Sequence, residues 1–182
     1  MDGLVAAPAP LPPVALAEVK AALRIATSEE DALLAGLVRS AADLCESFVG
    51  RLLIVRPVTE VLAAPRGWTR LGAAPVQAID AVAALAPDGS EAPLPAESYA
   101  IDIDAAGDGW VRLLAPCAEK RVRVAYVAGL AADPNGVPEA IRHGIVRLAA
   151  HLYAHREPDA EMAPPPAAVT ALWRPWRRLR LR

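Results

Sequence analysis

Two segments with helical periodicity lie far apart in this sequence, and each carries a single apolar stripe. Residues 14–50 and residues 138–156 place apolar side chains at steps of three and four. A helix with one apolar stripe buries it against another element, and the first N-terminal helix is too short to cover the long helix after it. We therefore expect helices from both ends of the chain to pack together.

The long N-terminal helix has recognisable end signals. Thr27 and Glu30 have the spacing of a capping box, and the neighbouring acidic residues suit the positive end of a helix dipole. The helix should continue to about Val49, because Gly50 is well suited to the left-handed conformation that ends a helix.

The middle of the chain has the pattern of short antiparallel strands. Residues 51–64 are rich in β-branched side chains, and Pro57 among them favours a bulge or an edge strand. Two later runs alternate apolar with polar or small residues at the period of a half-buried strand: Tyr99, Ile101 and Ile103, then Val122, Val124 and Tyr126. We expect a small antiparallel module of roughly five to seven strands.

These patterns predict an α+β chain, with a helical bundle formed by the N- and C-terminal helices, an inserted small antiparallel β module and an extended C-terminal arm. The expected parts are an extended Ala- and Pro-rich lead-in over 1–13, a helical core over 14–50 plus 135–157, a β module over 51–130, and a linker with the arm over 158–182. Residues 167–173 can form about two helical turns before Pro175.

The charge is distributed unevenly along the chain. The net charge is −2, yet residues 173–182 contain five arginines and no acid. Without those five, 14 basic residues remain against 21 acidic ones, so the rest of the chain carries about −7. Apolar residues interleave with the arginines, which favours an interaction arm over a solvated end. The candidate interface residues are Trp173, Arg174, Trp176, Arg177, Arg178, Leu179, Arg180, Leu181 and Arg182.

The sequence contains no pattern of an enzyme or cofactor site. It has no phosphate-binding glycine loop, nucleophile elbow or HExxH motif. Cys45 and Cys117 have no neighbouring base and cannot form a disulfide framework, so a reducing cytoplasm is the simplest compartment. No apolar run approaches the roughly 18 residues that span a bilayer. We expect no catalytic residue, no cofactor and no membrane partner.

Two groups of polar residues have an incomplete metal-site spacing. The acidic turn over 102–108 is spaced like a calcium loop, but Ala106 replaces an oxygen ligand and Leu113 occupies the place of the bidentate acid. His151 and His155 share a helix face without an evident third ligand. A surface turn and helix-surface histidines are the expected roles, and no metal is expected.

Four stretches together have a characteristic order. They are LAEVKAALRI at 16–25, followed by an acidic pair and the long helix; YVAG at 126–129; VPEAIRHGIVRLAAHLYAHRE at 137–157; and AVTALWRPWRRLRL at 168–181. In this order the chain resembles the head–tail connector (adaptor) proteins of long-tailed phages and phage-like gene transfer agents. It departs from their pattern at Trp173 and Trp176, where smaller or tyrosine residues are usual.

The resemblance implies a virion structural protein without enzymatic activity. Members of the family form a ring, generally dodecameric, beneath the portal of the capsid, and bridge the portal to a stopper or tail-completion protein. DNA passes through the ring during packaging and ejection without sequence-specific binding. By this resemblance the chain would assemble in the bacterial cytoplasm and reside at the head–tail interface of the particle. The C-terminal arm, residues 173–182, would bind the portal.

A nucleic-acid-binding module is the alternative. The arginines of 174–182 could contact phosphates, and Trp173 or Trp176 could stack on bases. The acidic remainder of the chain argues against this function, and DNA binding through several phosphates would weaken steeply with salt.

Overall fold

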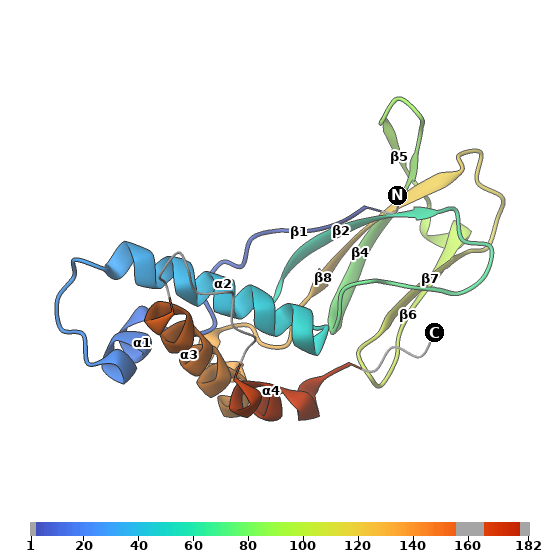
Figure 1. Cartoon of the computed structure of the whole chain (residues 1–182). Helices are drawn as coiled ribbons and strands as arrows, with labels where there is room; N and C mark the ends of the chain where they lie inside the picture. The colour runs from blue at the N-terminus through green and yellow to red at the C-terminus, as the bar shows by residue number, and fades with distance from the viewer. Residues whose placement is uncertain (1–2, 156–165, 179–182) are drawn as a thin grey trace. The chain divides into compact units, whose positions relative to one another are not determined.

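The computed structural model describes residues 3–155 and 166–178, and these residues form two compact units (Figure 1). The β unit comprises residues 3–10 and 55–130, and the helical unit comprises residues 11–54, 131–155 and 166–178. The chain is of the α+β class, as predicted, because its helices and its antiparallel strands are segregated along the sequence.

The helical unit contains four α-helices among the described residues. They are α1 (Leu16–Leu23), α2 (Asp31–Val49), α3 (Glu139–Ala154) and α4 (Ala167–Trp173), with short 3₁₀ turns η2 (Pro134–Gly136) and η3 (Arg174–Trp176). The predicted end of α2 is confirmed, because Gly50 has a φ of 68° and donates its amide to the carbonyl of Glu46 at 2.8 Å.

The capping-box prediction for α2 is wrong. The helix begins at Asp31, and Glu30 at its N-cap makes no side-chain capping bond. The chain instead turns tightly, with the amide of Asp31 donating to the carbonyl of Ser28 at 3.2 Å. The Asp31 carboxylate pairs with Lys20 of α1 at 2.6 Å, so a contact with the preceding helix helps to fix the start of α2.

Helices from both ends of the chain pack together in the helical unit. Both α1 and α2 contact α3. Arg142 of α3 binds the Glu18 carboxylate of α1 through two 2.9 Å hydrogen bonds, and the Tyr153 hydroxyl donates to Glu30 beside α2. The apolar stripe of α3 is buried at Ile141, Gly144, Ile145, Leu148 and Ala149. Each large aliphatic side chain buried in this way contributes about 2 kcal/mol.

The β unit contains eight antiparallel strands among the described residues. They are β1 (Leu4–Ala6), β2 (Arg56–Ala63), β3 (Thr69–Arg70), β4 (Val76–Leu85), β5 (Glu91–Pro93), β6 (Tyr99–Ile103), β7 (Gly109–Leu113) and β8 (Arg121–Ala128), with the 3₁₀ turn η1 (Ala96–Ser98) before β6. Five strands form a sheet in the order β1-β2-β8-β4-β5, and three form a second sheet in the order β3-β7-β6.

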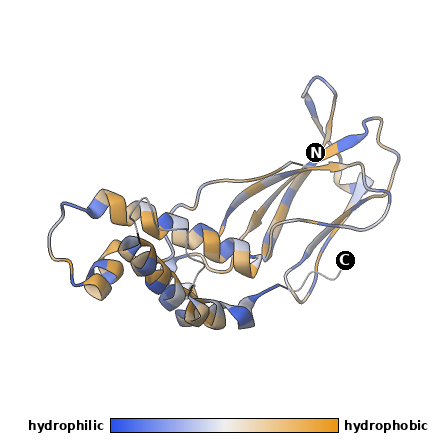
Figure 2. Cartoon of the chain, in the orientation of Figure 1, coloured by the Kyte–Doolittle hydropathy of each residue, from blue (hydrophilic) through white to orange (hydrophobic). Residues whose placement is uncertain are grey.

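The central strand β8 has the predicted alternation. Val122, Val124 and Tyr126 are buried, while Arg123 and Ala125 between them are half-buried. Figure 2 shows the mixture of hydrophobic and hydrophilic residues along the strands of this unit. A strand with a long partner on each side and one apolar face is the easiest kind to recognise from sequence.

The expectation that residues 1–13 are only an extended lead-in is wrong. Strand β1 pairs with β2 from Leu4 opposite Glu60 to Ala6 opposite Val58. Its two large side chains, Leu4 and Val5, are exposed. The strand therefore joins the sheet through backbone hydrogen bonds, and no buried alternation marks it in the sequence.

The expectation of a bulge or an edge strand at Pro57 is also wrong. Strand β2 lies between β1 and β8 in regular register, and the bulges are in β4. The Pro57 carbonyl accepts from the amide of Ala7 at 2.9 Å, so the ring nitrogen also faces the β1 side. Proline is tolerated there because it removes no hydrogen bond to β8.

Strand β6 exists as predicted, but it is not half-buried as its alternation suggested. Ile101 and Ile103 are exposed although they share one face of the strand. Strand β6 lies at the edge of the three-stranded sheet and contacts β4 of the other sheet, but its neighbours leave the face that carries Ile101 and Ile103 open to solvent.

Candidate interaction surfaces

The C-terminal segment is anchored on the helical unit by Trp173. Its side chain is only 1% exposed, and its indole nitrogen donates to the carbonyl of Ile141 in α3 at 3.2 Å. The ring of Phe48, from α2, lies 5.9 Å from it between centroids. Val169, one turn earlier in α4, is also fully buried, so this short helix forms because one of its faces enters the core.

Gly144 makes room for this tryptophan on α3. A Cβ at position 144 would lie 2.2 Å from the indole nitrogen of Trp173, far inside contact distance. Glycine weakens a helix interior by roughly 1 kcal/mol relative to alanine. Its presence in the middle of α3 is therefore explained by the close approach of the Trp173 ring.

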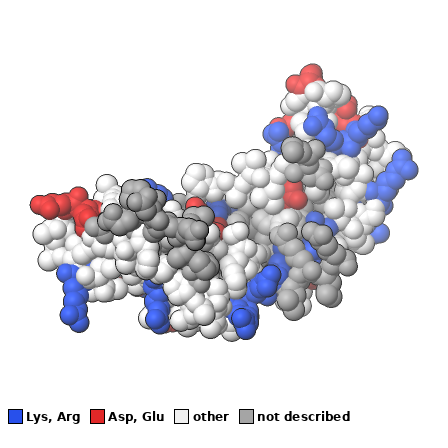
Figure 3. All heavy atoms as spheres, viewed as in Figure 1, with Lys and Arg blue, Asp and Glu red and all other residues white. Residues whose placement is uncertain are grey.

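The chain beyond Trp173 remains against the end of α2 as far as residue 178. The guanidinium of Arg177 lies over the Phe48 ring at 5.6 Å, and the amide of Arg178 donates to the carbonyl of Val49 at 2.7 Å. The last carbonyls of a helix carry partial negative charge, so arginines are favourable at this position. Figure 3 shows basic side chains on the helical unit near η3.

The expectation of an extended C-terminal arm is therefore wrong for residues 166–178, which pack on the helical unit. Trp173 presents no surface to a partner, because its ring fills the core of its own unit. Arg174 and Arg177 are exposed, and Trp176 and Arg178 are half-buried. The remaining predicted residues, Leu179, Arg180, Leu181 and Arg182, lie outside the described residues, as does most of the predicted linker, at 158–165.

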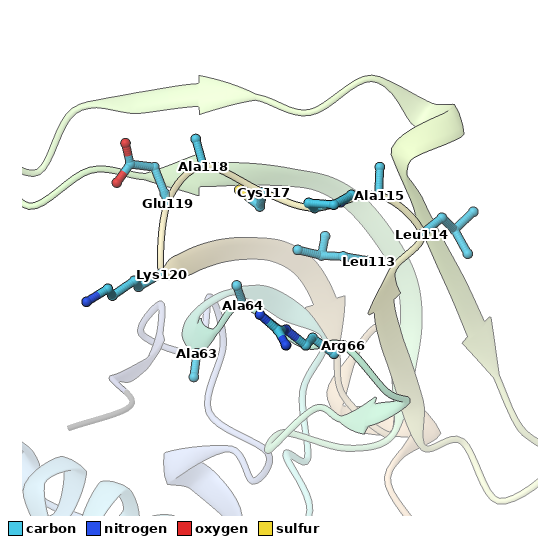
Figure 4. Close-up of a pocket in the computed structure, with 11 residues that line it drawn as sticks. Ala63, Ala64, Arg66, Leu113, Leu114, Ala115, Cys117, Ala118, Glu119 and Lys120 are labelled. Carbon is cyan, nitrogen blue, oxygen red and sulfur yellow. The ribbon is translucent and has the colours of Figure 1, made fainter.

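The β unit carries a second candidate surface, a pocket of about 490 Å³ beneath the loop over 114–120 (Figure 4). The amide of Ala64 donates to the carbonyl of Lys120 at 2.8 Å, which closes one side of the pocket. The lining includes the apolar Leu113, the half-buried Cys117 and charges of both signs at Arg66, Glu119 and Lys120. These groups do not converge on one point, so they do not define a small-molecule site.

Exposed apolar and basic side chains surround this end of the β unit. Trp68 and Leu114 are exposed, and the guanidinium of Arg112 lies over the Trp68 ring at 4.8 Å. Figure 3 shows Lys and Arg side chains gathered where β5 and the start of β8 lie. Tryptophan and arginine are frequent in protein–protein contacts. Sequence analysis missed this surface because loops distant in sequence build it.

Neither incomplete metal-site pattern forms a metal centre in the described part of the chain. Asp104 accepts hydrogen bonds from the amides of Ala106 and Asp108, both at 2.9 Å, and from the Trp110 indole at 3.0 Å. Its carboxylate therefore stabilises the turn, as expected of a surface β-turn. No group of three metal-ligating side chains is found within residues 3–155 and 166–178.

The histidine pair on α3 is a structural feature of the helix end. The rings of His151 and His155 lie 4.1 Å apart between centroids. Burial, and then the charge of His155, lower the pKa of His151. The same described ranges contain no helix that is long and apolar enough to cross a membrane.

A buried polar network fixes a loop in the β unit. Glu60 accepts from the Tyr126 hydroxyl at 2.8 Å and from the amide of Gly72 at 2.9 Å. The same hydroxyl accepts from the amide of Ala73 at 3.1 Å. These bonds tie the segment before β4 to the central strands, so their role is structural.

The chain is similar to known proteins of phages and of gene transfer agent particles. Residues 13–87 match the family described as phage gp6-like head-tail connector protein. The resemblance to head–tail connector proteins is confirmed. Among solved structures, the chain is similar to one from the neck of an empty gene transfer agent (GTA) particle computed with C6 symmetry. The TM-score is 0.79 and the identity 29%, and the match covers 98% of this chain and 97% of that one.

Two further solved structures have similar coverage. One comes from the virion of a native GTA particle, with 27% identity, a TM-score of 0.75 and coverage of 98% and 96%. The other comes from the neck of a native GTA particle computed with C12 symmetry, with 26% identity, a TM-score of 0.72 and coverage of 100% and 97%. Among curated proteins, none matches this chain.

Proposed function

We propose that this chain is a structural subunit of the neck of a phage or gene transfer agent particle, where it joins the portal to the next tail component. The observation that carries the proposal is the likeness to neck proteins over nearly the full length of both chains. That likeness includes both the helical and the β unit. The role is one of assembly, and it needs no catalytic residue.

The subunits form a ring of twelve around the DNA channel. Support comes from the relatives, whose particle necks were computed with C6 and C12 symmetry. A ring needs heterologous contacts, in which one face of a subunit meets a different face of the next. Twelve equivalent subunits also multiply weak contacts to the portal through their high effective concentration.

The surface at the end of α2 contacts the portal. Arg174 and Arg177 are exposed there and Trp176 is half-buried, so they can contact carboxylates and apolar groups of a partner. Residues 179–182 continue this contact. Trp173 has a different role from the one its sequence suggested, because it fixes the base of the segment to its own helical unit.

DNA crosses the ring without specific binding, and a stopper or tail-completion protein binds the opposite side. Outside residues 173–182 the chain carries about −7, which disfavours adhesion of phosphates. The nucleic-acid-binding alternative has less support, because Arg177 contacts Phe48 and Arg178 is held at the end of α2.

The test is a deletion of this chain in cells that produce the particles. We expect filled heads without tails, and normal tailed particles when the wild-type chain is restored, as seen by electron microscopy and mass spectrometry. Tailed particles of normal number in the deletion would contradict the proposal. Steeply salt-dependent DNA binding by the purified chain would favour the alternative.

The portal surface is tested by charge reversal. The double variant Arg174→Glu/Arg177→Glu should fold normally and be lost from the particles. A matched control, Arg39→Glu/Arg147→Glu, reverses two exposed arginines elsewhere on the helical unit and should be incorporated normally. Equal incorporation of both variants into particles would show that Arg174 and Arg177 do not contact the portal. The proposed connector role would be unaffected.

A further inference from the structure

Helix α2 carries two apolar stripes, and the helical unit buries only one of them. The buried stripe contains Leu34, Val38, Ala41, Cys45 and Val49. A second row, which we call the leucine stripe, consists of Leu33, Leu37 and Leu44. Leu33 is 43% and Leu44 is 45% exposed, and Leu37 is half-buried. Because successive residues of a helix are about 100° apart, the leucine stripe lies beside the buried one on the outer side of α2.

The leucine stripe has the spacing of a helix that docks into a groove. Its three side chains lie on one side of α2 over three turns, about 16 Å of helix, and the small Ser40 lies between Leu37 and Leu44. Helix α2 contacts α1, α3 and α4, and these contacts leave Leu33 and Leu44 exposed. The described helices of this unit therefore leave the stripe available to another molecule.

The pocket of the β unit can receive aliphatic side chains (Figure 4). Four of its lining residues are alanines, and Leu113, Leu114 and Pro116 add further apolar surface. Its volume of about 490 Å³ lies within the range of about 300–1,000 Å³ that is usual for binding pockets, so it has room for more than one leucine side chain. Apolar walls without converging polar groups suit side chains of another protein better than a small polar molecule.

The two surfaces have opposite charge. Residues 27–49, which contain α2 and the turn before it, include five acids and one arginine. Residues 63–70 and 112–121, which surround the pocket, include five basic residues and one acid. Figure 3 shows acidic side chains at the turn before α2 and basic ones where β8 begins. Opposite charges favour contact between the helix and the pocket, whereas like charges oppose pairing of two α2 helices or of two pockets.

Some of these charges are accessible to a partner. Glu29 and Asp43 are exposed on the helical unit, and Arg66 and Lys120 are exposed at the pocket. Trp68, two residues after Arg66, is also exposed, and tryptophan is frequent at the centre of protein–protein contacts. Each surface therefore combines apolar side chains with accessible charges of one predominant sign.

We propose that the leucine stripe of α2 in one copy docks into the pocket of the β unit in the neighbouring copy of the ring. This inference rests on the proposed function, because it supplies the contact that a ring requires. The helix and the pocket are different surfaces of one chain, so each added copy offers one unused helix and one unused pocket until the ring closes. The occupant of the pocket is therefore α2 of a second copy.

A native cysteine in the pocket allows a direct test. Cys117 lines the pocket, whereas burial raises the pKa of the Cys45 thiol inside the helical unit and keeps it unreactive. Leu33→Cys, Leu37→Cys and Leu44→Cys are introduced one at a time into the full-length chain in particle-producing cells, and the purified particles are oxidised with copper phenanthroline. At least one variant should form a disulfide with Cys117 of the next copy and give a ladder of linked multimers in non-reducing electrophoresis.

The control is Leu11→Cys, at another exposed apolar position of the helical unit. Linked multimers should be about tenfold more abundant in the stripe variant than in this control, because a disulfide forms only where two Cα atoms approach within about 7 Å. Multimers that persist after Cys117→Ser would indicate contact between two helices and would overturn the proposal. Links within one chain, links to a different protein, or no links in all three variants would also overturn it.

A charge in the leucine stripe tests whether the contact is needed for assembly. Leu44→Lys removes apolar surface and adds a positive charge opposite a basic pocket, so the number of copies per portal in purified particles should fall about tenfold, which corresponds to about 1.4 kcal/mol. Leu11→Lys is the matched control and should be incorporated normally.

Circular dichroism of the purified variants checks folding. Where Leu44→Lys does not fold, Leu44→Gln replaces it and should lower the number of copies about threefold, because it loses apolar contact without adding a charge. Incorporation of the folded variant at the wild-type level would overturn the proposal, while the connector role would stand. Absence of the wild-type chain from particles would instead remove the proposed function.

Discussion

The two units of the chain bury their large side chains very differently. Nine side chains larger than valine are at most 1% exposed in the described residues, and seven of them belong to the helical unit. The β unit contributes only Leu71 and Tyr126. Of nine exposed large apolar side chains, six belong to the β unit. The helical unit is therefore organised around its own core, whereas the β unit leaves apolar surface for other molecules.

The largest expected effect comes from removing the anchor of the helical unit. Trp173→Ala should destabilise this unit by about 3–5 kcal/mol, because it deletes a buried ring and leaves a cavity. Hydrogen exchange of α3 amides measures the effect, and the β unit should keep its protection. Trp176→Ala, at a half-buried site, is the matched control and should cost about 1 kcal/mol. Equal costs for both would mean that Trp173 does not anchor the core.

The corresponding test in the β unit is Tyr126→Phe. Loss of the hydroxyl removes one hydrogen bond to Glu60, which keeps its bond from Gly72, and removes the acceptor of the Ala73 amide, at a cost of about 1–3 kcal/mol. The change should appear as faster hydrogen exchange in β2, β4 and β8. Faster exchange of equal size in α2 and α3 would show that the two units do not unfold separately, and the contrast between them would fail.

A smaller loss of stability is expected from a substitution at Gly144, where the Trp173 ring packs against α3. Gly144→Ala forces the Trp173 ring to move, at a cost of about 2 kcal/mol, while it gains about 1 kcal/mol of helix propensity. The net loss should be about 1 kcal/mol in urea unfolding. In a Trp173→Ala background the same substitution should become stabilising. A loss in both backgrounds would show that the close approach is not the reason for the glycine.

The smallest effect is the pH dependence of the helical unit. The pKa of His151 is lower in the folded chain than its ordinary value, so the unfolded chain binds the proton more readily. The free energy of unfolding is therefore highest above the ordinary histidine pKa, near 6.5, and it decreases as the pH falls toward the lower pKa of His151 in the folded chain. His151→Gln should reduce the loss between pH 7 and pH 5, measured by urea unfolding. An unchanged pH profile would contradict this assignment.

The parts of the fold that sequence predicted are those where burial follows a simple period. The stripe of α3 and the alternation of β8 are examples, because each element has one buried face. Strand β1 could not be predicted, since its side chains are exposed and only backbone bonds place it in the sheet. Gly144 indicates that something approaches α3 closely, because a glycine within a helical pattern often has a packing reason, but only the structure shows that Trp173 is the neighbour.

Of the candidate surfaces too, one could be predicted from the sequence and others could not. Arg174 and Arg177 were recognised because a run of arginines is visible in any sequence, and the structure leaves them exposed. The end of the β unit around Trp68 and the exposure of Ile101 and Ile103 on β6 were missed. Both depend on how elements distant in sequence pack around these residues, which a local pattern does not encode.

The position of Trp173 after α1, α2 and α3 in the sequence also affects the order of events during synthesis. A ribosome releases α1 and α2 first, and their apolar faces must wait for α3 and then for the indole that enters beside Gly144. The core of the helical unit is complete only after α4 has been translated. Until then the side of α3 at Gly144 lacks the indole that fills it, so we expect a chain that stops before residue 173 to be less stable than one that contains α4.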